Sequence, residues 1–363
     1  MNVAVVGLRG IPDILGGVEA HCEQVMPRIV DANPDICVRV IGRTPYVQQD
    51  SVYRGVNVTS VYAPRGKHLE AIVATFLSIL KAARSGCDIV HIHAIGPALL
   101  APMARILGLK VVVTHHGEDF ERAKWNTFAK LSLRIGEWLG VHFANKVVAV
   151  SPSLQRKLHA RFPKYASRIA YIPNGMTALP HEAAEDQAVL DEFGLQKGNF
   201  ILVAARLVPE KGIDYLIEAH RASGSDKRLI IAGSAMHGSS YSEDLLSQAA
   251  HDVTFTGNLP RSKLAALYDN SALFVLPSYH EGLPIAALEA LSFGAPILLS
   301  DIAANTDLGL PERNYFPVGD AKALAQRLGV DSFDDLKPRS WQGLEQFNWD
   351  TVASELSQIY REL

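Results

Sequence analysis

Residues 1–10, MNVAVVGLRG, are a short apolar run that ends in a glycine turn, and residues 16–30, GGVEAHCEQVMPRIV, follow it as a predicted helix. A buried strand, a glycine turn and a helix are the first elements of a doubly wound α/β domain. Five further apolar runs in the first half predict buried strands: VRVIG (38–42), CDIVHIHA (87–94), LKVVVTHHG (109–117), NKVVAVS (145–151) and RIAYIPNG (168–175). Helical stretches lie between them, such as LEAIVATFLSILKAARSG at 69–86. Continuous apolar strands alternating with amphipathic helices indicate a parallel sheet covered on both faces.

The same pattern starts again after a polar, acidic stretch near 181–192. The second set of predicted strands is NFILVAAR (199–206), KRLIIAGSA (227–235), DVTFTGN (252–258), ALFVLPS (272–278) and APILLS (295–300). The break near 173–195 is therefore the expected domain boundary, and each half is expected to form its own doubly wound sheet. The tail FNWDTVASELSQIYREL (347–363) is predicted to be an amphipathic helix.

Composition agrees with two ordinary cores. The chain has 363 residues, 48% of them hydrophobic and 20% charged, which excludes a disordered protein. Cys22, Cys37 and Cys87 match no metal-ligand spacing, and an odd, sparse set indicates a reducing compartment. No apolar signal core precedes the first strand, and no apolar run reaches the ~20 residues that span a bilayer. We expect a cytoplasmic protein.

The two halves differ in charge. Residues 1–172 contain 21 Lys and Arg against 12 Asp and Glu, a net of +9, and the remaining residues contain 14 against 26, a net of −12. Different surface requirements are one explanation. The other is that the first half meets an anionic partner, because one stretch interleaves cations with large apolar side chains: Arg122, Lys124, Trp125, Phe128, Lys130, Leu131, Leu133, Arg134 and Trp138. Such a helix could lie on anionic lipid headgroups, or its tryptophans could face the sheet.

Residues 278–296, SYHEGLPIAALEALSFGAP, carry the most specific chemical pattern. Glu281 precedes a predicted helix that starts near Gly282, and Glu289 lies about two turns into that helix. Backbone N–H groups near Gly282 and Leu283 would point at an anion or hydroxyl group at the helix start. Glu289 could bind a ribose diol with its two oxygens. The alternative is a helix with one capping and one exposed glutamate.

A second pattern is ARLVPEKG at 205–212, which follows the strand ILVAA. Arg206 offers a planar fork and Lys211 a point charge, and together they suit a diphosphate leaving group. The alternative is an ion pair of a cation with Glu210 at the strand end.

Together these motifs resemble family 4 glycosyltransferases. The resemblance rests on ARLVPEKG, FTGNLPRSKLAALYDNSALFVLPS (255–278), HEGLPIAALEALSFGAPI (280–297) and the hinge-like YIPNG (171–175), in this order and spacing. GLRGIPDILGGVEAH (7–21) and DFERAKWNTFAKLSLRIGEWLG (119–140) resemble bacterial members that build surface polysaccharides, some of them rhamnosyltransferase-like.

The resemblance implies the GT-B fold, in which two Rossmann-like domains face a central cleft. Residues 1–172 would bind the acceptor, residues 173–345 would bind the nucleotide sugar, and residues 346–363 would form a helix that packs back toward the first domain.

The resemblance also implies roles for single residues. Arg206 and Lys211 would bind the donor diphosphate, and Glu289 the ribose hydroxyls. Glu281, with Gly282 and Leu283, would contact the donor sugar. The other donor-binding positions are Gly16 and Gly17 in a loop that approaches the phosphate, and Leu259 and Pro260, which would line the base pocket through the main chain.

A histidine near the donor sugar and acceptor is also implied, and His116 is the candidate. His115 alternates to the other side of the strand, and a structural histidine is the alternative for both. His91 and His93 share a face but lack further ligands at metal-binding spacing, so a structural or acceptor-side role is expected for them.

Two absences shape the expected chemistry. The G-L-R-G turn lacks the G-x-G-x-x-G fingerprint, which argues against a nicotinamide oxidoreductase. No Asp-x-Asp occurs in the sequence, so we expect no metal and no cofactor, with Arg206, Lys211 and helix dipoles neutralising the leaving diphosphate instead.

The sequence thus predicts a retaining glycosyltransferase that transfers a hexose from a nucleotide diphosphate sugar to a glycan or lipid-linked oligosaccharide during surface polysaccharide biosynthesis. A UDP-sugar is the first expectation, ahead of GDP-mannose and a deoxyhexose donor such as one carrying rhamnose. The alternatives are a nucleotide-sugar 2-epimerase and a catalytically silent sugar-binding subunit. No nucleic-acid partner is expected, and peripheral contact with the inner leaflet of the cytoplasmic membrane is a hypothesis.

Overall fold

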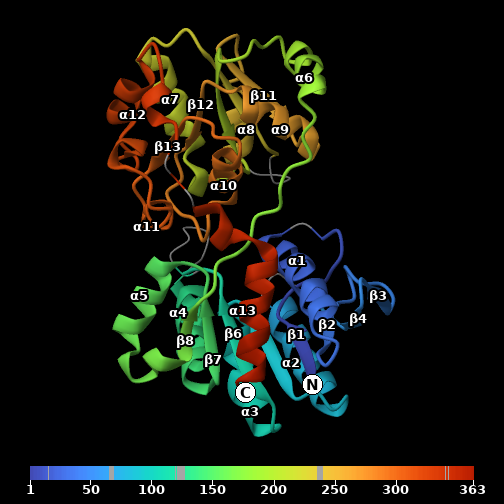
Figure 1. Ribbon diagram of the computed structural model, residues 1–363. Coiled ribbons are helices and arrows are strands. Elements are labelled where there is room, and N and C mark those ends of the chain that lie inside the picture. Colours follow the sequence, from blue (N-terminus) through green and yellow to red (C-terminus); the bar gives the residue numbers. More distant parts are fainter. Residues whose placement is uncertain are drawn as a thin grey trace. The chain divides into compact units, whose positions relative to one another are not determined.

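The computed structural model describes residues 1–14, 16–64, 69–118, 120, 127–234, 240–339, 341 and 343–363 (Figure 1). The chain divides into two compact units, each built around a sheet of its own. Unit 1 comprises Met1–Gly175 together with Glu345–Leu363, and unit 2 comprises Met176–Leu344.

Unit 1 contains an eight-stranded sheet in the order β3-β4-β2-β1-β5-β6-β7-β8, parallel except where β3 meets β4. Its strands are β1 (Asn2–Val6), β2 (Cys37–Arg43), β3 (Ser51–Tyr53), β4 (Val56–Val61), β5 (Ile89–His93), β6 (Lys110–His115), β7 (Lys146–Ala149) and β8 (Ile169–Tyr171). All six apolar runs predicted in the first half are strands of this sheet. The chain moves outward from β1 on one side and returns to β5 on the other, so the strand order reverses between β1 and β5.

The hairpin β3–β4 is absent from the sequence prediction. Its turn consists of Arg54 and Gly55, whose φ angles are 44° and 80°. Two residues with positive φ form the tight turn that antiparallel strands favour. The residues of β3 are exposed or half-buried, so this edge strand carries little of the apolar signal that reveals the buried strands.

Helices cover both faces of the sheet in unit 1 (Figure 1). They are α1 (Gly17–Ala32), α2 (Leu69–Arg84), α3 (Ala101–Ile106), α4 (Thr127–Phe143), α5 (Pro152–Arg161) and α13 (Trp349–Arg361). The helix predicted at 119–140 corresponds to α4, and residues 119 and 121–126 lie outside the described residues. None of the helices in the described ranges is long and apolar enough to cross a membrane.

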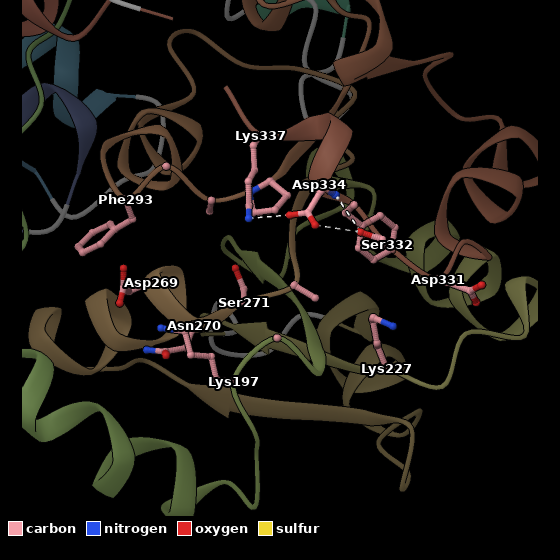
Figure 2. Close-up of a pocket in the computed structure, with 16 residues that line it drawn as sticks. Lys197, Lys227, Asp269, Asn270, Ser271, Phe293, Asp331, Ser332, Asp334 and Lys337 are labelled. Carbon is pink, nitrogen blue, oxygen red and sulfur yellow. Dashed lines mark hydrogen bonds and ion pairs between the residues drawn. The ribbon is translucent and has the colours of Figure 1, made fainter. Parts of the chain in front are cut away.

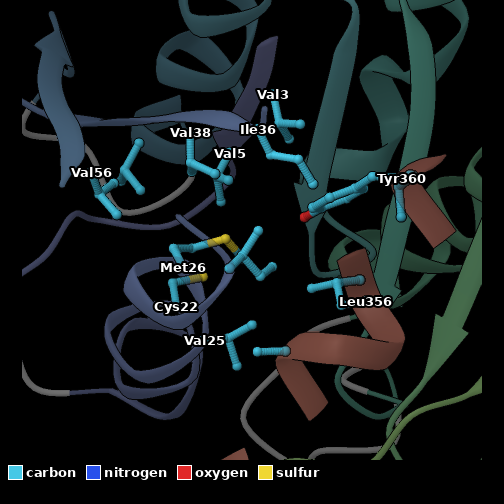
Figure 3. Close-up of a cluster of buried hydrophobic side chains, with 14 of the residues drawn as sticks. Val3, Val5, Cys22, Val25, Met26, Ile36, Val38, Val56, Leu356 and Tyr360 are labelled. Carbon is cyan, nitrogen blue, oxygen red and sulfur yellow. The ribbon is translucent and has the colours of Figure 1, made fainter. Parts of the chain in front are cut away.

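The C-terminal helix α13 is part of the core of unit 1, which confirms the predicted packing. Val352, Leu356 and Tyr360 are four residues apart, so they share one face, and all three are buried. Figure 3 shows Leu356 and Tyr360 in one apolar cluster with Val25 and Met26 of α1. The helix is the last element of the chain, yet it completes the first unit.

Unit 2 contains a six-stranded parallel sheet in the order β11-β10-β9-β12-β13-β14. Its strands are β9 (Phe200–Ala204), β10 (Arg228–Ala232), β11 (Val253–Gly257), β12 (Leu273–Leu276), β13 (Ile297–Ser300) and β14 (Tyr315–Phe316). The five predicted strands are present. The sixth, β14, was not predicted, because its two residues are too few to show a strand pattern. The strand order reverses between β9 and β12, and ligands of such sheets bind where the order reverses, beyond the carboxyl ends of the strands.

The helices of unit 2 alternate with its strands. They are α6 (Asp186–Glu192), α7 (Ile213–Ser223), α8 (Ser240–Leu246), α9 (Arg261–Asn270), α10 (Ile285–Ser292), α11 (Ala303–Thr306) and α12 (Ala321–Leu328). The helix expected to start near Gly282 begins at Ile285, so Glu289 lies in its second turn and not two turns from its start. Pro284 directly precedes the helix, and a proline ring is compatible with a helix start.

Candidate functional site

The loop after β9 carries the two predicted cations of unit 2. The side chain of Arg206 is exposed and forms no hydrogen bond or ion pair with the described residues, so the alternative pairing with Glu210 is not observed. Lys211 is half-buried. Gly212 follows with φ at 62°, and a Cβ there would lie 2.4 Å from the carbonyl oxygen of Pro277. Only glycine therefore allows this loop to approach the neighbouring strand so closely.

The loop after β12 brings Glu281 to Lys211. The Lys211 ammonium donates to Glu281 Oε1 at 2.5 Å, and the Ser278 hydroxyl donates to the same oxygen at 2.7 Å. The backbone N–H of Tyr279 donates to the carbonyl of Glu210 at 2.9 Å, which fastens the two loops together. Residues 70 positions apart thus form one charged centre at the reversal of strand order.

Backbone donors stand beside this centre. Within the described residues, the N–H groups of Gly282 and Leu283 donate to no protein acceptor. They precede α10 by two to three residues and are half-buried. Unpaired N–H groups at a helix start are the usual ligands of anions and hydroxyl groups.

Glu289 is buried on α10, in a second charged position of unit 2. The Tyr268 hydroxyl donates to its Oε2 at 3.2 Å, and the Arg261 guanidinium lies 3.7 Å from its Oε1. Burial raises the pKa of Glu289, while Arg261 and the Tyr268 hydrogen bond partly lower it. Leu259 and Pro260 lie just before α9, after the carboxyl end of β11, so they share the edge of the sheet with Arg206 and Glu281.

The glycine pair of unit 1 starts α1. A Cβ on Gly16 would lie 2.0 Å from the Glu19 carboxylate and 2.3 Å from the Arg9 guanidinium. Arg9 donates to Glu19 from its backbone N–H at 3.0 Å and from Nε at 3.1 Å, an ion pair that the sequence analysis did not anticipate. Gly17 is exposed and has open space where its Cβ would be. The φ angle of 157° is what favours glycine at position 16, and a phosphate contact by either glycine stays a prediction.

The two neighbouring histidines at the end of β6 have different surroundings. His115 is buried, with Nε2 at 3.0 Å from Glu137 Oε1 and Nδ1 accepting the N–H of Gly117 at 3.2 Å. Both of its ring nitrogens are therefore used within the protein. His116 is half-buried, and its Nε2 lies 3.0 Å from Nδ1 of His93. A role of His116 at the reacting sugar stays a prediction.

His91 has a structural role. Its Nδ1 lies 2.6 Å from the hydroxyl of Tyr360 on α13, and its Nε2 lies 2.7 Å from the hydroxyl of Thr114. Both nitrogens are occupied, and the contact with Tyr360 ties the C-terminal helix to the sheet. His93 has a different neighbour, the Cys22 thiol, whose sulfur lies 3.6 Å from His93 Nε2.

Two other polar features of unit 2 lie at the amino-terminal edge of its sheet. A surface pocket of about 430 Å³ is lined by residues that precede β9, β10, β12 and β13, such as Lys197 and Lys227, and by residues after α12, such as Asp334 (Figure 2). In the described part of the chain, His181, Asp186 and Asp269 are the one group of three possible ligands within 4.8 Å of one another. His181 already pairs with Asp186 at 3.0 Å, and both features are on the edge opposite Arg206 and Lys211.

Comparisons with known proteins identify the class. Residues 15–177 match the family model described as Glycosyltransferase Family 4, and residues 188–329 match the model described as Glycosyl transferases group 1. A glycosyltransferase of Methanocaldococcus jannaschii is 25% identical, over 99% of this chain and 98% of its own.

Solved structures share the fold. Sucrose-phosphate synthase from Thermosynechococcus elongatus superposes with a TM-score of 0.79 at 22% identity, covering 99% of this chain and 98% of that one. HepE of Anabaena, solved with UDP-glucose, gives 0.76 at 17% identity over 100% of both chains. The chain is therefore a glycosyltransferase of the GT-B architecture. Its first half matches the family 4 model and its second half the group 1 model.

Proposed function

We propose that this glycosyltransferase is a retaining enzyme that transfers a hexose from a UDP-sugar to a glycan or lipid-linked oligosaccharide in surface polysaccharide biosynthesis. The observation that carries the donor assignment is the charged centre of unit 2. Arg206 pairs with none of the described residues, and Lys211 is held by Glu281 at 2.5 Å. Both cations follow β9 and Glu281 follows β12, at the reversal of strand order.

Each group of that edge has a place in donor binding. Arg206 and Lys211 hold the diphosphate, and the N–H groups of Gly282 and Leu283 bind donor oxygens. Glu281 contacts the donor sugar while it positions Lys211. Glu289 accepts the ribose hydroxyls, and the main chain of Leu259 and Pro260 lines the base pocket.

The choice of uracil as the base and of a hexose as the sugar is supported by the HepE structure, which shares the fold and was solved with UDP-glucose. The polysaccharide role is supported by the segment at 7–21, which resembles enzymes that build bacterial surface glycans. A deoxyhexose donor such as one carrying rhamnose is the second candidate.

The reaction needs few groups from the protein. The acceptor hydroxyl oxygen bonds to the anomeric carbon on the face from which the diphosphate departs, and the hydroxyl proton passes to the leaving diphosphate oxygen. Arg206 and Lys211 stabilise the charge that develops there, since preorganised cations cost no reorganisation during the reaction. No double displacement is invoked, because no carboxylate is assigned as a nucleophile.

We further propose that transfer needs no divalent metal, since two cations serve the diphosphate. Turnover should be unchanged after exhaustive chelation. Activity that disappears with chelator and returns with Mg²⁺ or Mn²⁺ would overturn this assignment. Substitution of His181 would then test whether the group at the opposite edge of unit 2 is responsible.

The acceptor side is assigned to unit 1, with a membrane-bound lipid carrier as the acceptor. Gly136 and Gly140 let α4 pack closely, since a Cβ at Gly136 would lie 2.1 Å from the carbonyl oxygen of Ile95. The opposite face of α4 therefore points outward, with Phe128, Leu131, Ile135 and Trp138 exposed. Arg122, Lys124 and Trp125 lie outside the described residues.

A nucleotide-sugar panel tests the proposal directly. A donor present at ~100 times its Kd should stabilise the protein by ~2.7 kcal/mol in a thermal-shift assay. UDP-hexoses should give the largest shift, and NMR of the product should show the donor's anomeric configuration retained. Isomerised donor in the absence of acceptor would indicate the epimerase, and binding without turnover on any acceptor would indicate the silent subunit.

A further inference from the structure

Arg261 is the first residue of α9 and lies beside the carboxylate of Glu289 on α10. Its Nη2 is 3.7 Å from Glu289 Oε1 and donates to the carbonyl of Thr177 at 3.1 Å. Thr177 belongs to the segment that precedes α6, so the guanidinium joins three parts of unit 2 that are far apart in the sequence. The side chain is 53% exposed, yet these two contacts fix where its charge lies.

The local electrostatics of α9 do not favour a cation at this position. The N–H groups of the first turn give the N-terminus of a helix a partial positive charge, which repels a positive side chain. The first turn of α9 nevertheless contains Arg261 and Lys263 and no acidic residue. Lys263 pairs with Glu192 of α6, which is exposed, whereas the partner of Arg261 is a buried carboxylate. A buried charge needs a partner, so the position of Arg261 is explained by Glu289 and not by the helix that carries it.

The two oxygens of Glu289 have separate partners. The Tyr268 hydroxyl donates to Oε2 at 3.2 Å, and Arg261 faces Oε1. Tyr268 is fully buried, so its hydroxyl is a fixed donor on one side of the carboxylate. Each oxygen of an ionised carboxylate can accept more than one hydrogen bond, so both can still accept a ribose hydroxyl. The two partners therefore orient the carboxylate without filling it.

Arg261 also opposes the effect of burial on the charge of Glu289. Burial raises the pKa of Glu289, and Arg261 lowers it more than the Tyr268 hydrogen bond does. Among the described residues, these two are the titratable groups that interact with Glu289. The strands β12 and β13, which pack against α10 as α9 does, contain no titratable residue. The ionisation of Glu289 therefore depends on Arg261 more than on any other described side chain.

We propose that Arg261 is a positioning residue for donor binding, which together with Tyr268 holds the Glu289 carboxylate in the orientation that accepts the two ribose hydroxyls. Arg261 contacts the carboxylate and not the ribose in this arrangement. Its substitution should therefore weaken the binding of a nucleotide only through Glu289, and only where the nucleotide carries the ribose diol. The inference deepens the proposed function and rests on it for the role of Glu289 at the ribose.

A matched pair of variants and a matched pair of ligands test this role by calorimetry. Arg261→Met removes the charge and keeps the aliphatic stem, whereas Arg261→Lys keeps the charge. We expect the Kd for UDP at neutral pH to rise about fivefold in Arg261→Met, since a half-exposed ion pair is partly screened by solvent, and to change little in Arg261→Lys. The ligand 2′,3′-dideoxy-UDP lacks both ribose hydroxyls, and its Kd should be the same in Arg261→Met as in the wild type.

The pH profile of UDP binding separates positioning from a merely structural role. Without Arg261 the carboxylate of Glu289 takes up a proton at a higher pH, so the pH at which the affinity falls should move upward in Arg261→Met and stay near that of the wild type in Arg261→Lys. In Glu289→Gln, which has no carboxylate to hold, adding Arg261→Met should cause no further loss. Arg221→Met is the control, because Arg221 is 43% exposed and pairs with Asp252 at 3.1 Å on other elements of unit 2. It should leave UDP binding unchanged.

Two results would overturn the inference alone. One is a wild type that prefers UDP to 2′,3′-dideoxy-UDP together with an Arg261→Met variant that binds UDP equally tightly. The other is an equal loss for both ligands in Arg261→Met at unchanged Tm, which would mean that Arg261 contacts another part of the nucleotide directly. A wild type that binds both ligands equally would instead refute the ribose role of Glu289 in the proposed function, and the positioning role would fall with it.

Discussion

The two points at which strand order reverses are built from the same elements but carry opposite chemistry. In unit 2 the loops after β9 and β12 hold an ammonium, a carboxylate and a guanidinium that pairs with none of the described residues. In unit 1, α1, the end of β5 and the residue after β6 hold three imidazoles whose pKa values lie below the ordinary range. The edge in unit 2 suits a charged ligand, and the edge in unit 1 suits hydrogen bonds with an uncharged ligand.

This difference matches what a glycosyl transfer requires of each partner. The leaving diphosphate gains negative charge as the bond breaks, so fixed cations stabilise it more in the transition state than in the ground state. The hydroxyl groups of the sugars carry no charge, and a cation near the attacking oxygen would withdraw electron density from it and make it a weaker nucleophile. Substitutions on the two edges should therefore differ in size and kind.

The largest losses are expected from the charged edge. Arg206→Ala and Lys211→Ala should each cost ~2–4 kcal/mol of transition-state stabilisation, which is about 30- to 1,000-fold in kcat/KM. Lys197→Ala is the control, because Lys197 lines the pocket at the opposite edge of the same sheet. Near-native turnover of either variant, with an unchanged Tm, would remove that residue from the active site.

The uncharged edge should give an effect that is confined to turnover. His116→Ala should lower turnover ~10²-fold or more and leave nucleotide affinity nearly unchanged. His115→Ala should act on stability instead, because it removes the contact of His115 with the buried Glu137 at 3.0 Å and leaves that carboxylate only its ion pair with Arg161. If His115→Ala abolishes turnover in a protein of normal Tm while His116→Ala does not, the two roles are reversed.

Glu289 gives the charged edge a pH dependence that the imidazole edge should lack. Its pKa is raised from 4.5 by burial, so protonation starts at a higher pH than in an ordinary glutamate. The carboxylate is the form that accepts two ribose hydroxyls, and donor affinity should therefore fall as the pH is lowered through this raised pKa. Titration of donor binding should show the decrease in wild type and not in Glu289→Gln, whose affinity should be low at every pH. A wild-type decrease that begins only below pH 4.5 would contradict the assignment.

The sequence allowed most residues of the charged edge in unit 2 to be predicted, but few of those at the imidazole edge in unit 1. Arg206, Lys211 and Glu281 stand in short motifs directly after apolar strands, and such motifs are readable because parallel strands end at one edge. The contact of Lys211 with Glu281 was not predicted, since it depends on β9 lying beside β12 and not beside the next strand in the chain.

The imidazole edge was less readable. His21 lies within a helix beside Cys22 and Val25, where a polar residue on an inward face shows no motif of its own. Its burial follows from the packing of α1 against α13, an element more than 300 residues later. The one feature of the sequence that indicates its burial is that His21, Val25 and Ile29 are four residues apart and so share one face of the helix.

The smallest expected effect concerns the outer surfaces of the two units. Among the described residues, exposed large apolar side chains gather on α2, α3 and α4 of unit 1, whereas in unit 2 they are few and come from separate elements: Leu246, Tyr279, Val318 and Val330. Trp138 is 48% exposed, so it does not face the sheet as the alternative interpretation of this helix required. Lys130 and Arg134 accompany the apolar stripe of α4.

Each such cation near an anionic surface contributes ~1 kcal/mol, and salt shortens the screening length to ~8 Å at 0.15 M. The protein should therefore sediment with anionic vesicles at low salt and dissociate as salt rises. The double variant Lys130→Glu with Arg134→Glu should lose most of this binding. Lys110→Glu with Lys164→Glu changes the net charge equally on other elements of unit 1 and should lose less. Equal losses in both double variants would show that vesicle binding depends only on the net charge of the protein. If the wild type binds neutral vesicles as well as anionic ones, or binds neither kind, a soluble glycan acceptor is favoured.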